Sequence, residues 1–96
     1  LASVGNLRNV MSIGDDAFNG CNMLASVGNL SNVTSIGEWA FSGCSSLASI
    51  GDLRSVTEIG NYAFYECPSL TLRVLPNSYA EDYAKSNNIK YTYIED

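Results

Sequence analysis

The sequence predicts a repeat solenoid of the α/β type. A repeat of 23 residues occurs three times, at residues 1–23, 24–46 and 47–69, and the last 27 residues do not follow it. A fixed period of this length is typical of solenoids, in which each repeat forms one rung that contacts mainly its neighbours. We therefore expect an elongated scaffold with broad faces, closed by a cap at its C-terminal end.

Within each copy the apolar residues recur at every third position. In the second copy they are Leu24, Val27, Leu30, Val33 and Ile36, followed by Ala40, Phe41 and Cys44. This spacing fits neither the period of a strand nor that of a helix, but it fits short extended segments joined by turns. We expect a strand over 24–30 that stacks beside 1–7 and 47–53 in one short parallel sheet. A second extended or turn segment follows over 33–37, and the AF-x-x-C stretch returns the chain on an irregular, turn-rich face.

One glycine position is shared by all three copies, at Gly14, Gly37 and Gly60. A glycine is required where a turn needs positive φ or where two backbones approach closely. Substitution of this glycine is expected to cost stability.

The tail predicts a helix-strand cap over 73–96, after three repeats and the start of a fourth within 1–72. Ser78 and Glu81 have the S-x-x-E spacing of a capping box, which predicts a short helix to about residue 86. The alternation over 89–94 predicts an edge strand. Four tyrosines would cover the last rung while keeping their hydroxyls in water, namely Tyr79, Tyr83, Tyr91 and Tyr93.

Charge and hydropathy exclude two classes of partner. The net charge is -5, from 10 acidic and 5 basic residues, without the basic stripe that nucleic-acid binding requires. No apolar run approaches the length of a membrane span. The first residue begins a repeat abruptly, with no polar segment to cover the first rung, so we expect that the chain is a fragment of a longer array.

Three cysteines, Cys21, Cys44 and Cys67, recur at the repeat period. The chain has no His and no C-x-x-C pair, so a metal site is not indicated, and a buried structural column is expected. A disulfide between neighbouring rungs is the alternative. No Ser or Cys has an activating histidine, and Asp15 and Asp16 lack partners, so we predict no enzyme activity and no cofactor.

The repeat resembles the BspA-type leucine-rich repeat family. Val33-Thr34-Ser35-Ile36-Gly37, then Ala40-Phe41 and Cys44, match the VTSIGxxAFxxC part of that family's unit. The resemblance implies a right-handed leucine-rich-repeat superhelix with a parallel sheet on one face. It also implies a secreted or surface-displayed protein, mostly bacterial, that serves adhesion and protein recognition, and it brings no catalytic residues.

The sequence departs from the family at its Leu-Pro pair, which reads Asn6-Leu7, Asn29-Leu30 and Asp52-Leu53. A buried column of Asn and Asp would be costly unless its members bonded one another. We therefore expect the leucines to turn inward and the polar residues to lie at the turn. The alternative is an exposed leucine stripe on the concave face that would act as a sticky binding surface.

The candidate binding residues lie on the predicted sheet face. Small residues are expected to line it, namely Ser3, Gly5, Ser26, Gly28, Ser49 and Gly51. Arg8 and Arg54 flank this face and would either engage an acidic partner or only offset the negative charge. An ordinary solenoid surface without a ligand remains the other interpretation of the same pattern.

Trp39 and Tyr62 occupy the same position on adjacent rungs, and Tyr65 lies close beyond. These rings would form an aromatic ladder that binds sugars or anchors a protein partner. The alternative is that they shield the column of Phe41 and Phe64 from water.

The function predicted from these observations is a non-catalytic protein-recognition or adhesion module at the cell surface or outside the cell. Its partner would be a protein of a host or neighbouring cell. A glycan-binding module that uses Trp39 and Tyr62, and a passive spacer, are the alternatives. An exposed first rung at Leu1, Val4 and Ile13 would also pair two copies of the chain.

Overall fold

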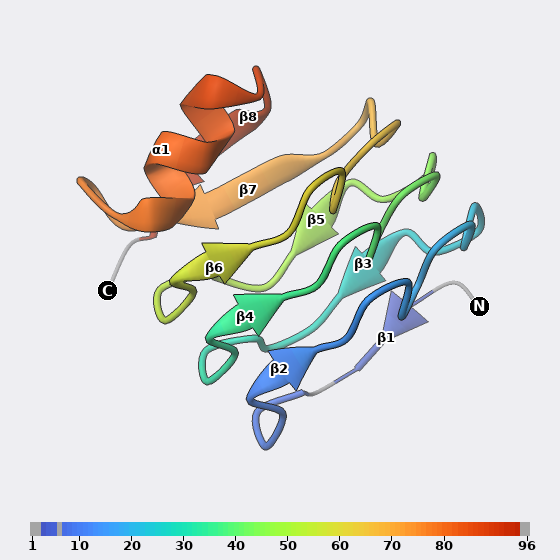
Figure 1. The fold of residues 1–96 in the computed structure, drawn as a ribbon, viewed down its shortest axis with the longest axis horizontal. Helices are drawn as coiled ribbons and strands as arrows, with labels where there is room; N and C mark the ends of the chain where they lie inside the picture. Colours follow the sequence, from blue (N-terminus) through green and yellow to red (C-terminus); the bar gives the residue numbers. More distant parts are fainter. Residues whose placement is uncertain (1–2, 6, 95–96) are drawn as a thin grey trace.

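The chain winds into stacked rungs that a short helix closes at the C-terminal end (Figure 1). The structure is a computed structural model, and it describes residues 3–5 and 7–94. The expectations for Leu1 and Asn6 lie outside the described residues.

Each rung contributes one short strand to a five-stranded parallel sheet, here named sheet A, in the order β1-β3-β5-β7-β8. The strands are β1 (Ser3–Val4), β3 (Ser26–Val27), β5 (Ser49–Ile50), β7 (Thr71–Val74) and β8 (Lys90–Tyr93). Ser3 lies opposite Ser26, and Ser26 lies opposite Ser49, so the period of 23 residues is also the register of the sheet. The three repeat strands are much shorter than the predicted span of 24–30 and its equivalents.

The strands are short because the chain turns soon after the glycine. The Asn29 side-chain oxygen accepts the Ser31 N–H at 2.9 Å, and the Asp52 carboxylate accepts the Arg54 N–H at 3.4 Å. A hydrogen bond from the N–H of residue i+2 to the side chain of residue i favours a turn and competes with strand pairing. The polar residues therefore lie at the turn, as predicted.

The leucines that follow these polar residues face the core. Leu30 and Leu53 are fully buried, and Leu7 is half-buried against the core. The inward orientation is confirmed, and the alternative of an exposed leucine stripe is wrong. The leucines face inward because the opposite orientation would bury the neighbouring Asn and Asp side chains, which is costly.

A second parallel sheet, sheet B, lies beside sheet A and corrects the prediction of a single sheet. It contains β2 (Ser12–Ile13), β4 (Ser35–Ile36) and β6 (Glu58–Ile59), in that order. Both sheets are drawn side by side in Figure 1. The segment predicted as extended or turn over 33–37 thus forms a ladder of its own.

Close backbone approach explains the shared glycine at the end of each sheet B strand. A Cβ atom added to Gly60 would lie 2.5 Å from the Glu38 nitrogen and 2.7 Å from the Gly37 carbonyl carbon. Around Gly14 there is no atom within 4 Å of the added Cβ among the described residues. The glycine is therefore needed where one rung stacks on the preceding one.

The turn-rich segments that complete each rung, at 15–23, 38–46 and 61–69, are here named return arms. They stack the phenylalanines into a column, with ring centroids 5.2 Å apart between Phe18 and Phe41 and 5.4 Å apart between Phe41 and Phe64. Phe41, in the middle of this column, is fully buried. The repeated sequence therefore produces a core of like residues stacked on like residues.

The cap consists of α1 (Tyr79–Ser86), which connects β7 to the parallel strand β8. The Ser78 hydroxyl accepts the Glu81 N–H at 3.1 Å, as the capping box predicts. The Glu81 carboxylate accepts the Asn77 N–H at 2.8 Å, one residue before the expected position. Both the helix and the edge strand of the predicted cap are present.

Tyr79 and Tyr93 of the cap are exposed, as predicted, but their hydroxyls also bond to the protein. The Tyr79 hydroxyl bonds to Ile59 of β6, and the Tyr93 hydroxyl donates to the Glu81 carboxylate. They stabilise the cap through specific polar contacts, whereas the sequence indicated only that tyrosines would cover the last rung.

At the other end of the solenoid, the apolar side chains expected on an exposed edge face inward. Ile13 is 5% exposed, and Val4 is half-buried against the core. Pairing of two copies through this rung stays a prediction.

Candidate functional site

The outward face of sheet A brings together the small residues predicted from the repeat. Ser3, Ser26 and Ser49 lie in register, and the row continues to Thr71 of β7. These side chains point outward because their strand neighbours point into the core. Ser3, Gly5 and Ser49 are exposed, whereas Ser26, Gly28 and Gly51 are half-buried, because each of the latter glycines stacks directly on the rung before it.

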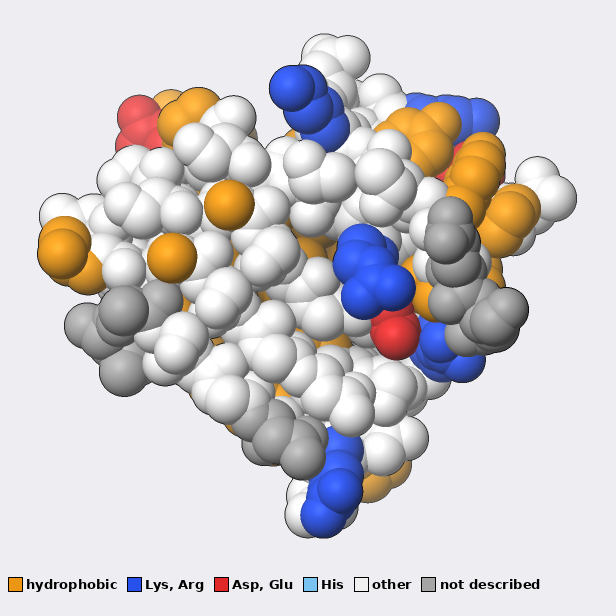
Figure 2. All heavy atoms as spheres, turned by 180° about the vertical axis from the view of Figure 1, so that it is seen from behind, with side chains coloured by type: hydrophobic (Ala, Val, Ile, Leu, Met, Phe, Trp, Pro, Cys, Tyr) orange, Lys and Arg blue, Asp and Glu red, His pale blue; other side chains and the backbone are white. Residues whose placement is uncertain are grey.

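A hollow of about 570 Å³ lies over β3 and β5 on this face. Its floor includes Gly28 and Gly51, and its rim carries polar and charged side chains, namely Asn29, Ser31, Asp52, Arg54 and Arg73. The small residues of the floor have no long side chains that project from the sheet. A partner's main chain can therefore approach the backbone of the sheet. Seen from the side opposite to Figure 1, the middle of the surface is mostly white, Lys and Arg side chains are scattered over it, and apolar side chains gather toward its left and right sides (Figure 2).

Arg73 on β7 lines this hollow and is not among the site residues predicted from the sequence. Its strand neighbours Leu72 and Val74 are fully buried, so Arg73 points outward and is exposed. The alternation of T-L-R-V carries this signal, but the predicted boundary between the fourth repeat and the cap, after residue 72, falls inside the strand.

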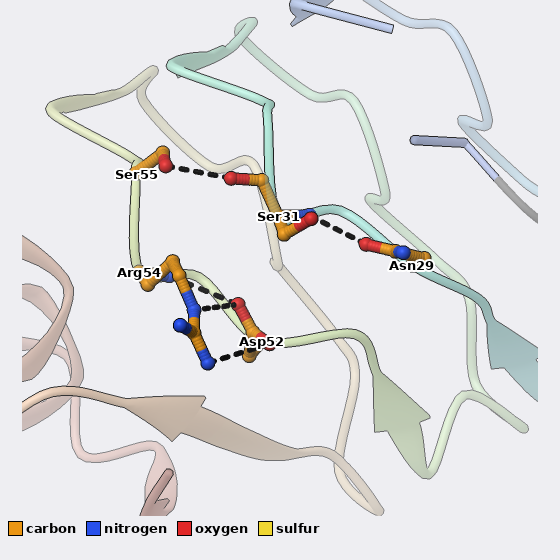
Figure 3. Close-up of polar contacts among 5 residues, drawn as sticks. All are labelled: Asn29, Ser31, Asp52, Arg54 and Ser55. Atoms are coloured by element: carbon orange, nitrogen blue, oxygen red, sulfur yellow. Dashed lines mark hydrogen bonds and ion pairs between the residues drawn. The ribbon is translucent and has the colours of Figure 1, made fainter. Parts of the chain in front are cut away.

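Arg54 is held in place by Asp52 on the same turn. Its Nε atom lies 3.1 Å from the Asp52 carboxylate, which also accepts the Arg54 backbone N–H (Figure 3). The Ser55 hydroxyl donates to the Ser31 carbonyl at 2.6 Å and ties this turn to the preceding rung. An exposed ion pair of this kind adds little stability, but it orients the guanidinium at the rim.

Arg8 does not join Arg54 at the hollow. It is exposed on the first rung and lines a separate depression with Met11 and Asn32. The Asn32 amide donates to the Arg8 carbonyl at 2.5 Å, so this segment is tied to the second rung. Of the two predicted arginines, only Arg54 borders the hollow.

The aromatic residues of the return arms form a compact cluster away from the hollow. The rings of Trp39 and Tyr62 stack with centroids 4.6 Å apart, and Tyr65 meets both rings edge-on. The exposed fractions are 37% for Trp39, 56% for Tyr62 and 49% for Tyr65. The predicted ladder is present, but Trp39 and Tyr62 already cover one face of each other.

The cysteines form the predicted structural column. Cys44 is buried and Cys21 and Cys67 are half-buried, and all three are free thiols, so the alternative of an inter-rung disulfide is wrong. The Cys44 thiol donates to the Phe18 carbonyl, and the Cys67 thiol donates to the Phe41 carbonyl. Burial raises the pKa of Cys44 and raises the pKa of Cys67 to about 11, so both thiols stay protonated.

Asp15 of the first return arm has a structural role. An Asp15 carboxylate oxygen accepts the Glu38 N–H of the next rung at 2.8 Å. Among the described residues there is no group of three potential metal ligands, and no helix of theirs is long and apolar enough to cross a membrane.

Comparison with known families agrees with this architecture. The family model described as "BspA type Leucine rich repeat region (6 copies)" matches residues 1–96, and the chain belongs to this family. Repeats of this family commonly mediate protein interaction, and they are generally non-catalytic. No curated protein and no solved structure matches the chain.

Proposed function

We propose that this chain is a protein-recognition module that binds its partner across the outward face of sheet A. The observation that carries the proposal is the low hollow over β3 and β5, bordered by Arg54 and Arg73. Membership in the BspA-type repeat family supports a role in protein interaction. We further propose an adhesion role in a secreted or cell-surface protein, with a partner on a host or neighbouring cell.

The chemistry of the face favours a protein over a small ligand. Hydroxyls and glycines offer a flat floor for a partner's backbone, and the two arginines suit an acidic side chain on the partner. Arginine is enriched among the residues that dominate interface energies. Because Asp52 orients Arg54 before binding, little side-chain freedom is lost on association.

The test is a binding screen of the chain against immobilised extracellular-matrix proteins, with the double variant Ser26→Arg plus Ser49→Arg. Ser49 lines the hollow and Ser26 lies opposite it on β3, so two bulky cations at these positions should abolish binding. The matched control is Ser46→Arg plus Ser69→Arg, two exposed equivalent serines on the return arms, which should leave binding unchanged.

The outcomes separate the competing functions. Binding that survives the double variant on sheet A would move the protein site elsewhere. Absence of binding to any protein would favour a passive spacer. A sugar-binding role carried by Trp39 and Tyr62 alone has weaker support, since each ring covers a face of the other.

A further inference from the structure

The backbone bonds between return arms run in one direction and stop at the third rung. N–H groups of one arm donate to carbonyls of the next arm, as Trp39 does to Asn61 and Gly43 does to Tyr65. Tyr62 and Glu66 hold the corresponding positions on the third arm. Among the described residues, no acceptor takes the N–H of either. Two backbone donors are thus left open where the arms end.

The cap covers this end only in part. The side chain of Tyr79 reaches β6, where its hydroxyl accepts the Ile59 N–H at 3.1 Å. One helical turn further along α1, burial raises the pKa of Tyr83, and a hydrogen bond from the Phe64 backbone lowers it in part. The two tyrosines thus take the place of a next rung at Ile59 and Phe64. They do not do so at Tyr62 or Glu66.

A cleft of about 770 Å³ remains between the third return arm and α1. Tyr62 and Tyr65 line it from the arm, Tyr79 and Tyr83 line it from α1, and Asn87 lines it from the end of that helix. The two helix residues are spaced four apart, which places them on one face of α1. Aromatic rings therefore border the cleft from both sides.

The chemistry of the cleft narrows the class of ligand. Glu66 is the one charged residue among the described residues that line it, and no Lys or Arg does so. With a net charge of -5 for the chain, an anionic ligand is disfavoured. Polar atoms make up most of the lining, so a purely apolar ligand would leave donors and acceptors unpaired.

We propose that this cleft binds a neutral oligosaccharide. A sugar presents an apolar C–H face that packs on the ring of Tyr62, and hydroxyls that both donate and accept. Its oxygens would accept the N–H groups of Tyr62 and Glu66, and its hydroxyls would donate to the Glu66 carboxylate. The volume of the cleft lies within the range of about 300 to 1,000 Å³ that is usual for ligand sites.

Trp39 is a positioning residue in this site. It does not line the cleft, but its ring stacks on Tyr62 at 4.6 Å and holds that ring in place. The site therefore differs from a sugar-binding ladder of Trp39 and Tyr62, and it goes beyond the protein recognition proposed for sheet A.

An extended proline-rich peptide is the main competing ligand, because such peptides dock in aromatic grooves. It offers carbonyl acceptors and apolar rings but almost no donors for Glu66. The mixture of backbone donors and a carboxylate acceptor in the cleft favours the sugar.

The test is calorimetric titration of the full chain with cellotetraose, chitotetraose and mannotetraose, and with sialyllactose and a proline-rich decapeptide for comparison. We expect at least one neutral sugar to bind, and Tyr62→Ala to weaken it by about tenfold or more. Tyr62→Phe, which keeps the ring, should retain binding within about threefold of the original affinity. Glu66→Gln, a replacement of the same shape, should weaken binding by several-fold.

The proposal is overturned if none of the neutral sugars binds, if only sialyllactose or the peptide binds, or if Tyr62→Ala and Glu66→Gln both leave sugar affinity unchanged. Circular dichroism establishes that each variant is folded. The double variant Ser26→Arg plus Ser49→Arg should leave sugar binding intact, so that failure here is distinguishable from failure of the protein site on sheet A.

Discussion

Sheet A and sheet B end in different ways at the cap. Sheet A continues from β5 to β7 and β8, so each strand pairs with another strand. Sheet B stops at β6, where the Tyr79 hydroxyl accepts the Ile59 N–H and donates to the Ile59 carbonyl at 3.4 Å. A parallel ladder can therefore be closed by a strand or by a side chain. Beside the side-chain closure, a cleft and open donors remain.

The same contrast applies to the core. A residue in the middle rung is stacked between two equivalents, whereas its counterpart in the first described rung is stacked on one. Phe41 is fully buried between Phe18 and Phe64, and Phe18 is half-buried. The energetic value of a repeated residue should therefore depend on its rung.

The largest expected effect is that of Phe41→Ala. The substitution removes a buried ring from the centre of the column, and it should lower the free energy of unfolding by about 3–5 kcal/mol. Phe18→Ala, at a half-buried position, should cost clearly less. Urea unfolding followed by circular dichroism measures both, and equal losses would contradict the dependence on the rung.

A smaller effect is expected from Gly60→Ala, because the added methyl group would meet the backbone of Glu38 and Gly37. The backbone must shift, at a cost of about 1–3 kcal/mol. Gly14→Ala is the matched control and should change stability by less than about 0.5 kcal/mol. If both variants lost the same stability in urea unfolding, turn conformation rather than rung stacking would explain the glycine.

Closure of sheet B by a side chain is tested with Tyr79→Phe. The variant leaves the Ile59 N–H and carbonyl without their partner, and it should cost about 1–2 kcal/mol. Tyr62→Phe is the control, since no described residue bonds to the Tyr62 hydroxyl. In thermal unfolding, Tyr79→Phe should lower the melting temperature and Tyr62→Phe should not. An unchanged melting temperature for Tyr79→Phe would show that the hydroxyl does not stabilise the edge.

The smallest effect concerns pH and the contact between Glu81 and Tyr93. The Tyr93 hydroxyl, then the Asn77 N–H, lowers the pKa of Glu81 from 4.5, so this stabilisation is present above pH 4.5 and is lost as pH falls through the lowered pKa. The bond to Glu81 raises the pKa of Tyr93 from 10 to about 12, so stabilisation is present below pH 10 and is lost as pH rises through about 12.

This pH dependence is measured as the difference in melting temperature between the original chain and Tyr93→Phe. The difference should be largest near neutral pH and should shrink at both acidic and alkaline pH. A difference that stays constant across the range would contradict a contact that depends on the ionised Glu81 and the neutral Tyr93.

Much of the fold could be predicted from the sequence because equivalent residues occur in three copies of the repeat. The inward leucines and the capping box were predicted because local rules decide them. Sheet B was not, since a strand of two residues cannot be distinguished from a turn before its neighbours are placed. The contacts of Tyr79 and the place of Arg73 depend on how the cap packs, and the cap occurs only once.

Within the part of the chain that the structure describes, the N–H groups of Tyr62 and Glu66 on the third return arm have no acceptor, whereas the equivalent N–H groups of the first two arms donate to the next arm. Amide hydrogen exchange followed by NMR tests this difference residue by residue. The account predicts slow exchange for Trp39 and Gly43, which donate to the next arm, and fast exchange for Tyr62 and Glu66 at the same positions one rung later. Equal protection of the two pairs would contradict it.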